Sequence, residues 1–187
     1  MKTDEFEPLY RSGGWDGKGS GPGSTEEFTR EFRDVLSETL KSLEIRSMFD
    51  LGCGDWQWMR HVMWPAGLSY TGWDVAPTAI KEADNALPGF TVECRDAFDD
   101  DGWPKADMLF HKDVLHHLED KQIRRLIDKS RAYPYVLFVT DFPDEMNALP
   151  FKWPSDVEFT GRIVHKFNHR APGYAYGPKL AVLQMNT

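Results

Sequence analysis

Short apolar segments alternate with amphipathic ones through the middle of the chain, and this alternation restricts the fold more than any other feature. Five apolar runs have the length of strands, at residues 45–51, 68–73, 90–94, 107–111 and 135–140. Helical patterns lie before and between them, at residues 28–43, 56–62, 77–87 and 120–132. Because parallel strands need long crossover connections, the pattern predicts an α/β fold with a mostly parallel sheet and helices on both faces.

We expect residues 1–187 to form one domain. A chain of 187 residues, 41% of them hydrophobic, can build one core but is too short for two full domains. Strand-like segments at residues 159–167 and 180–185 follow the alternating region. Residues 1–24 end in a glycine-rich stretch that predicts a loop or lid. Ser24 and Glu27 then form a capping-box pattern, which predicts that the first amphipathic helix begins there.

Composition disfavours several kinds of partner and site. There are 22 Lys and Arg residues against 30 Asp and Glu, and the formal net charge of -8 makes nucleic acid an unlikely partner. We find neither an apolar targeting core at the start nor an apolar run of about 20 residues, so we expect a soluble, cytoplasmic protein without a membrane span. Cys53 and Cys94 belong to no metal-binding or disulfide pattern, and we expect two reduced thiols and no bound metal.

The most informative motif is a predicted strand that runs into a glycine turn, Asp50-Leu-Gly-Cys-Gly54. Gly52 and Gly54 allow a sharp bend and let a ligand approach where a Cβ atom would collide. About 20 residues further on, the second strand ends at Asp74, where a carboxylate can accept both hydroxyls of a ribose. This pairing predicts a cofactor that contains a nucleoside.

The residues after the turn argue against a dinucleotide. The third glycine of a dinucleotide motif is missing, and the carboxylate of Asp55 would repel a diphosphate. At the end of the third strand, Asp96 can accept an adenine amino group beside the apolar Ala97. Polar side chains also follow the fourth strand. All these strand ends meet at the carboxyl edge of a parallel sheet, where such folds bind ligands.

In order and spacing, these motifs resemble those of class I S-adenosylmethionine-dependent methyltransferases. The resemblance runs from about residue 45 to the end and includes Asp113-Val-Leu-His-His-Leu118. It implies a Rossmann-like, seven-stranded sheet and S-adenosylmethionine as cofactor. The turn would lie under the methionine part, Asp74 would hold the ribose, and Asp96 with the Ala97 amide would recognise adenine. The cofactor-binding residues that it implies are Asp50, Gly52, Cys53, Gly54, Asp74, Val75, Asp96, Ala97, Lys112 and Asp113.

Two details of the resemblance need separate mention. The N-terminal glycine/serine stretch is similar to a loop in some small bacterial and phage members of the family. Trp56 stands where many members carry another glycine, which concerns the geometry near the methionine carboxylate.

Methyl transfer from a sulfonium needs alignment and exclusion of water more than covalent help. A base is needed only if the acceptor is a hydroxyl or a protonated amine. His116 and His117 follow the fourth strand and are candidate bases, because a neutral imidazole near pH 7 suits that role; packing or capping is the alternative role. Asp113 joins them as a candidate catalytic residue, although lining the pocket is the simpler role, and Lys112 is expected to be solvated.

Residues 141–178 follow the fifth strand at the same sheet edge and are interpreted as an acceptor-side insertion. Its aromatic and polar side chains suit a polar acceptor such as a sugar; an irregular loop with surface aromatics is the alternative. The candidates are Asp141, Asn147, Trp153, Arg162, His165, His169, Arg170, Tyr174 and Tyr176. His165 and His169 have a metal-ligand spacing, but they lie in a predicted strand and loop, so we expect no metal there.

The sequence therefore predicts O-methylation of a small polar or glycan-type acceptor. A nucleic-acid methyltransferase is an alternative, which the charge and the lack of an Asn/Asp-Pro-Pro-aromatic motif or a Pro-Cys pair disfavour. A catalytically silent cofactor-binding scaffold and an NAD-dependent oxidoreductase are two others. The oligomeric state, the acceptor and the methylated atom are left open.

Overall fold

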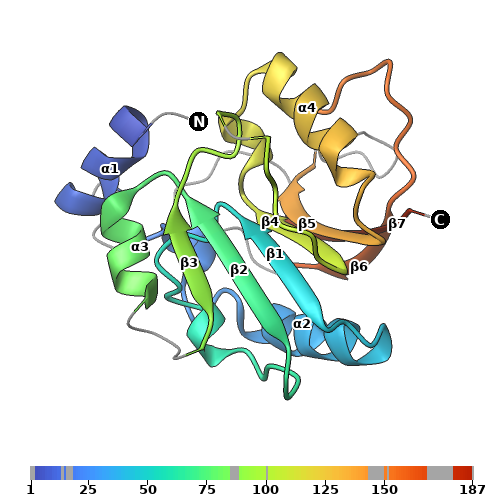
Figure 1. The fold of residues 1–187 in the computed structure, drawn as a ribbon, viewed down its shortest axis with the longest axis horizontal. Coiled ribbons are helices and arrows are strands. Elements are labelled where there is room, and N and C mark those ends of the chain that lie inside the picture. Colours follow the sequence, from blue (N-terminus) through green and yellow to red (C-terminus); the bar gives the residue numbers. More distant parts are fainter. Residues whose placement is uncertain are drawn as a thin grey trace.

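The computed structural model describes residues 3–13, 15, 19–84, 89–99, 101–142, 150, 152–167 and 179–186. Within them, seven strands form one sheet in the order β3-β2-β1-β4-β5-β7-β6 (Figure 1). The strands are β1 (Ser47–Leu51), β2 (Ser69–Asp74), β3 (Thr91–Cys94), β4 (Met108–Lys112), β5 (Tyr135–Asp141), β6 (Arg162–Lys166) and β7 (Lys179–Met185). The predicted strands are confirmed, with ends that differ by a few residues.

The sheet is parallel from β3 to β5 and antiparallel at its other side. There, β7 lies between β5 and β6 and runs antiparallel to both. The register of β5 and β7 pairs Asp141 with Lys179. The first residue of β7 thus reaches the carboxyl edge of β5, where a parallel fold of this kind places its ligand site.

Helices cover both faces, as predicted. They are α1 (Thr3–Ser12), α2 (Arg30–Ser42), α3 (Pro77–Asp84) and α4 (Asp120–Ser130). Neighbouring residues of a strand point to opposite faces. Accordingly, Met48 belongs to one core cluster with Phe32 of α2, and Phe49 belongs to a second with Ile123 of α4. The central strands are therefore buried on both sides, which explains their continuous apolar runs.

The N-terminal segment, predicted as a glycine-rich loop or lid, begins with a helix that was not predicted. Residues 3–12 form α1, which lies beside α3 (Figure 1). Phe6, Leu9 and Tyr10 have the helical spacing that could have revealed it. Phe6 is buried against Ala76 and Ala79, and Leu9 and Tyr10 pack against the same cluster.

Two helix predictions were wrong in detail. α2 begins at Arg30, and no capping box forms at Ser24, which instead ends a short 3-10 turn at Pro22–Ser24. The hydroxyl of Thr25 accepts a hydrogen bond from the Phe28 amide at 3.3 Å. A local turn therefore satisfies this amide before the helix starts. In residues 56–62 only a 3-10 turn forms, at Met59–His61.

Cys53 is buried, Cys94 is exposed, and neither forms a disulfide; the expectation that they bind no metal stays a prediction. In the part of the chain that the structure describes, no helix is long and apolar enough to cross a membrane.

Candidate active site

The glycine turn after β1 has the predicted geometry. Gly52 and Gly54 have φ angles of 77° and 60°, which side chains other than glycine adopt at a cost. A Cβ atom on Gly54 would lie 2.4 Å from the Ser20 hydroxyl. The Gly54 amide donates to Oδ2 of Asp74 at 3.0 Å, and the Ala76 amide donates to Oδ1 at 2.9 Å. Asp74 thus fixes the turn and keeps acceptor capacity, because a carboxylate has about four lone-pair sites.

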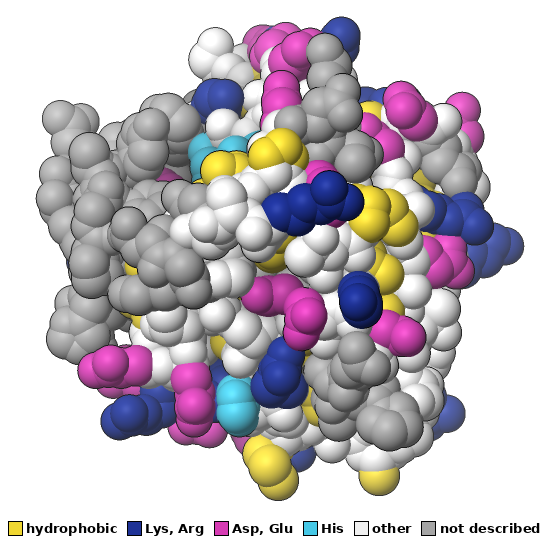
Figure 2. Space-filling view, turned by 90° about the vertical axis from the view of Figure 1, so that its left-hand side faces the viewer, with side chains coloured by type: hydrophobic (Ala, Val, Ile, Leu, Met, Phe, Trp, Pro, Cys, Tyr) yellow, Lys and Arg dark blue, Asp and Glu magenta, His cyan; other side chains and the backbone are white. Residues whose placement is uncertain are grey.

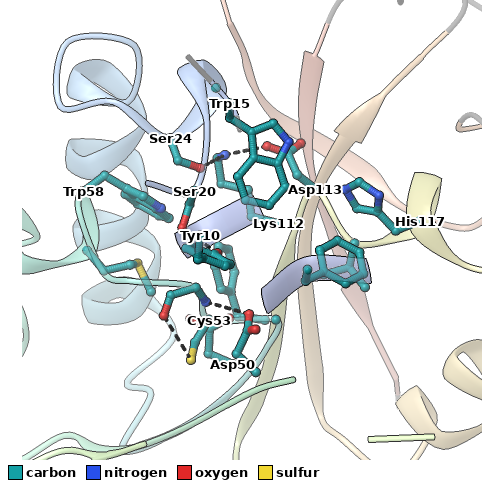
Figure 3. Close-up of a pocket in the computed structure, with 18 of the residues that line it drawn as sticks. Tyr10, Trp15, Ser20, Ser24, Asp50, Cys53, Trp58, Lys112, Asp113 and His117 are labelled. Carbon is teal, nitrogen blue, oxygen red and sulfur yellow. Dashed lines mark hydrogen bonds and ion pairs between the residues drawn. The ribbon is translucent and has the colours of Figure 1, made fainter. Parts of the chain in front are cut away.

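A pocket opens above this turn at the carboxyl ends of the strands (Figure 3). Its empty volume is about 740 Å³, part of which is open to solvent. The predicted residues that line it are Asp50, Gly52, Cys53, Gly54, Asp74, Lys112, Asp113, His116 and His117. The structure therefore brings together most of the site that the sequence indicated.

Three predicted cofactor residues lie outside this lining. Val75 is buried in the cluster under α1, and Ala97 is buried in the core. Asp96 accepts the Phe98 amide at 2.8 Å, a bond that shapes the loop after β3. Their roles toward adenine stay predictions.

The N-terminal segment, part of which was predicted as a loop or lid, supplies a wall of the pocket. Phe6, Tyr10 and Trp15 line it together with Ser20 and Ser24. Tyr10 and Ser20 share a hydrogen bond of 2.9 Å between their hydroxyls (Figure 3). Whether the segment moves as a lid remains a prediction.

Two contacts fix this wall to the rest of the domain. The Ser20 hydroxyl donates to Oδ1 of Asp55 at 2.7 Å, directly after the glycine turn. The carboxylate of Glu7 accepts hydrogen bonds from the amide and from the hydroxyl of Thr78, at 2.9 and 2.7 Å. A carboxylate is favoured there because Thr78 lies in the first turn of α3, where amides lack helical partners. These bonds from Thr78 lower the pKa of Glu7.

Two buried carboxylates lie beneath the pocket. Burial raises the pKa of Asp50 to about 7, although the Tyr70 hydroxyl donates to it at 2.6 Å. Burial likewise raises the pKa of Asp74 to about 6, against the bonds from backbone amides. A cationic ligand would stabilise both carboxylates in their charged form. This donor and charge set fits a cofactor that carries ribose hydroxyls and positive charge.

A cluster of charges closes the pocket beyond β4. The prediction that Lys112 is solvated was wrong: its side chain is 4% exposed and donates to Ser24 at 3.0 Å and to Asp113 at 2.6 Å. Lys179 donates to the other oxygen of Asp113 at 2.5 Å. Burial lowers the pKa of Lys112 to about 8. Burial opposes ionisation of Asp113, but the two lysines outweigh it and hold its pKa well below the usual range.

His116 and His117 lie side by side at the pocket, with ring centroids 4.1 Å apart. Nδ1 of His116 lies 4.0 Å from Oδ2 of Asp141. His117 instead packs edge-on against Phe6, with centroids 5.0 Å apart. Burial lowers the pKa of His116 to about 4 and also lowers the pKa of His117, so both rings are neutral at pH 7, as a base requires.

The proposed acceptor-side insertion is only partly within the described residues. Asp141 lies beside His116, which lines the pocket. Trp153 packs against Phe138 and Phe159 in the core, and Arg162 and His165 lie on β6 at the edge of the sheet. Asn147, His169, Arg170, Tyr174 and Tyr176 fall outside the described residues. The assignment of this segment to the acceptor therefore stays a prediction.

The fold is shared with methyltransferases of known structure. Magnesium protoporphyrin IX methyltransferase (ChlM) from Synechocystis PCC 6803, with bound S-adenosylhomocysteine, is 15% identical and aligns over 97% of both chains with a TM-score of 0.66. The N-methyltransferase NodS from Bradyrhizobium japonicum WM9 is 18% identical, with a TM-score of 0.60 over 86% of this chain and 97% of that one. The bifunctional kinase-methyltransferase WbdD is 15% identical, with a TM-score of 0.63 over 84% of this chain.

The present chain spans 40% of the length of WbdD. Its sequence matches no family model. The chain has the Rossmann-like fold of class I S-adenosylmethionine-dependent methyltransferases, so the predicted resemblance is confirmed for the fold.

Proposed function

We propose that this protein is an S-adenosylmethionine-dependent methyltransferase that methylates a hydroxyl of a small polar or glycan-type acceptor. The observation that carries the proposal is one pocket with two chemically different sides. A glycine turn backed by Asp74 forms one side, and His116, a half-buried ring whose pKa burial lowers, lies on the other. The shared fold supports the cofactor class, because ChlM of the same fold binds S-adenosylhomocysteine.

The cofactor, when bound, supplies an activated methyl group on a sulfonium. The chain would bind it through backbone and carboxylate groups: the Gly52–Gly54 turn allows close approach, and Asp74 accepts ribose hydroxyls. Lys112, Asp113 and Ser24 offer donors and an acceptor for a charged amino-acid end. Because Tyr10 and Trp15 line the same pocket, the N-terminal wall would keep water from the reacting atoms.

His116 or His117 would take the proton of the acceptor hydroxyl as the methyl group arrives. Both rings line the pocket and are neutral at pH 7, which leaves one ring nitrogen free to accept a proton. Asp113 is less suited to this step, because two lysine contacts already engage its carboxylate.

The class of acceptor rests on the overall charge and on the histidines of the pocket. The net charge of -8 disfavours a polyanion such as nucleic acid. The neighbours named above include one enzyme described as acting on a porphyrin and one described as an N-methyltransferase, so a shared fold leaves the acceptor open. A polar, hydroxyl-bearing acceptor is favoured here by the neutral histidines. A scaffold that binds the cofactor without turnover is the competing possibility.

The test uses S-adenosylmethionine labelled in its methyl group and fractionated cell extracts as the source of acceptor. We expect label to enter a small polar fraction. Replacement of the base by asparagine, in His116→Asn or His117→Asn, should lower the transfer rate by about two to four powers of ten and leave cofactor affinity nearly unchanged. Label in nucleic acid would support the alternative, and cofactor binding without transfer would support the scaffold. Full turnover in both variants would place the base elsewhere.

A further inference from the structure

Two buried polar atoms face each other at the end of the pocket. Nδ1 of His116 and Oδ2 of Asp141 are 4.0 Å apart, and the two side chains are 12% and 4% exposed. Neither atom has a hydrogen-bond partner among the residues that the structure describes. A buried donor or acceptor without a partner is destabilising. A shift of about 1 Å would bring these two atoms within hydrogen-bond distance and satisfy both.

The surroundings hold these two groups in place and distinguish His116 from His117. Asp141 ends β5, where its backbone pairs with Lys179 of β7. His116 lies in a 3-10 turn at Leu115–His117. The ammonium of Lys152 donates to the carbonyl oxygen of His116 at 2.9 Å and so fixes the backbone of this turn. His117 instead contacts the ring of Phe6, and the carboxylates that favour its protonation are those of Asp113 and Glu5.

We propose that Asp141 positions His116 as the base of the reaction. The Asp141 carboxylate accepts a hydrogen bond from Nδ1–H of His116, which leaves Nε2 of the neutral ring free to take a proton. The inference rests on the proposed function and deepens it, because it assigns the base to one histidine and requires an acceptor that carries a proton, a hydroxyl. The hydroxyl proton passes to Nε2 as the oxygen bonds the methyl carbon. The bond that breaks joins that carbon to the sulfonium, and its electron pair stays on sulfur.

The charges around the ring support this division of roles. Besides Asp141, His116 faces His117, Asp113, Lys112 and Lys179. The lysines and His117 disfavour an imidazolium, and both lysines already contact Asp113. Asp113 also favours the imidazolium, but its two oxygens contact the lysines, whereas Oδ2 of Asp141 faces Nδ1 of His116 and has no hydrogen-bond partner among the described residues. Burial raises the pKa of Asp141, while Lys179 and Lys112 oppose that rise.

The experiment needs no acceptor. Protein with ¹⁵N-labelled histidine is studied by NMR at pH 7, with and without S-adenosylhomocysteine, and His116→Asn assigns the signal. We expect His116 to carry its proton on Nδ1. Asp141→Ala should abolish that preference. Asp141→Asn keeps an acceptor oxygen but no charge, so it should keep the tautomer while the protonation midpoint of His116 falls by about one pH unit or more.

Thr140→Val is the matched control, because Thr140 is the buried neighbour on the same strand and its hydroxyl also lacks a partner within the described residues. It should leave the tautomer unchanged. A proton on Nε2 in the unaltered protein, or the same tautomer in Asp141→Ala, would overturn the proposal. Calorimetry with S-adenosylhomocysteine tests the proposed function separately, since the tautomer is also read in the free protein.

Discussion

Asp113 has a left-handed backbone conformation, with a φ angle of 60°, directly after β4. Such a conformation costs of order 1–3 kcal/mol for a residue other than glycine and is retained where the surroundings fix it. Here the carboxylate is held between Lys112 and Lys179, and the backbone amide donates to the Val139 carbonyl at 2.9 Å. The strain turns the chain so that the residues after Asp113 reach the pocket.

The first residue-scale prediction concerns Asp74. Asp74→Asn keeps an oxygen for one of the two backbone amides but removes the charged acceptor that we assign to the ribose. The loss should weaken S-adenosylhomocysteine binding by about 1.5–3 kcal/mol, measured by calorimetry. Glu93→Gln, on the exposed side of β3, is the control and should bind normally. An unchanged affinity in Asp74→Asn would remove this residue from the site.

The second residue-scale prediction concerns the contribution of Asp50 to the pH dependence of stability. Its pKa is about 7 in the folded protein and 3.8 in an unfolded chain, so between these pH values the native state binds more protons than the unfolded chain. The contribution of this group to stability is therefore full below pH 3.8 and is lost as the pH rises through 7.

Asp50→Asn removes this titration and leaves an oxygen that can still accept the Tyr70 hydroxyl. Over pH 4.5–7.5, the slope of stability against pH should be less negative in the variant than in the unaltered protein, by up to about 1.4 kcal/mol per pH unit. Urea unfolding without cofactor measures it, and the difference between the two proteins removes the effects of other groups. Parallel curves would show that Asp50 titrates normally.

The site could be predicted where its residues belong to a local sequence motif. Gly52, Gly54 and Asp74 follow from spacing along two strands. Lys179 could not be predicted, because its contact with Asp113 depends on the antiparallel register of β5 and β7. Ser20 is similar, since its bond to Asp55 spans 35 positions of the chain. A sequence pattern reports neighbours on one element, whereas these contacts arise from packing between elements.

At the scale of elements, α1 is the part of the site with the least support from the sheet. It rests on α3 through the bonds from Thr78 to Glu7 and through Phe6. The same helix carries Tyr10 into the pocket. Docking of α1 and binding of a ligand in the pocket should therefore stabilise each other.

Glu7→Ala tests this coupling. The variant loses both bonds to the start of α3, a change comparable to the loss of a helix cap and worth about 0.5–2 kcal/mol. Amide exchange in residues 5–12 should become faster, and S-adenosylhomocysteine should bind more weakly. Arg11→Ala is the control, because Arg11 contacts the same carboxylate but is 73% exposed and contributes little.

In the unaltered protein, S-adenosylhomocysteine should slow exchange in α1 and in residues 19–24. Equal exchange with and without this ligand would contradict a lid.

Element prediction succeeded where burial produced a clear apolar pattern and failed where a contact between elements decided the local conformation. The strands and α4 were recognised because burial on a sheet or on one helix face produces clear apolar patterns. Residues 56–62 are apolar at helical spacing but begin with Trp56 at a φ angle of 61°, which stops a helix from starting there. Its indole donates to the Tyr70 hydroxyl at 2.9 Å, so a tertiary contact decides this local conformation.

At the scale of the whole molecule, the net charge is negative, and the face in view carries charges of both signs. On the face in Figure 2, Lys and Arg side chains lie scattered among Asp and Glu, without one large basic patch. The buried lysines instead lie inside, at the pocket, where each contacts Asp113. The overall charge of -8 thus disfavours polyanions outside, while the interior offers cations to a small ligand.

The last prediction compares cofactors through the stability of the whole domain. A ligand that binds only the native state at 100 times its Kd stabilises it by about 2.7 kcal/mol, which for a domain of this size raises Tm by about 5–10 °C. S-adenosylhomocysteine should produce this shift, and NAD should not, because Asp55 lies beside the turn where a diphosphate would have to bind. Gly54→Ala should abolish the shift, since its Cβ atom would lie 2.4 Å from the Ser20 hydroxyl. Gly67→Ala is the matched control: its φ angle is also positive, at 78°, but a Cβ atom there meets no described atom within 4 Å, so it should melt earlier yet keep the full shift. A shift with NAD instead would identify a dinucleotide site and overturn the assignment of the cofactor.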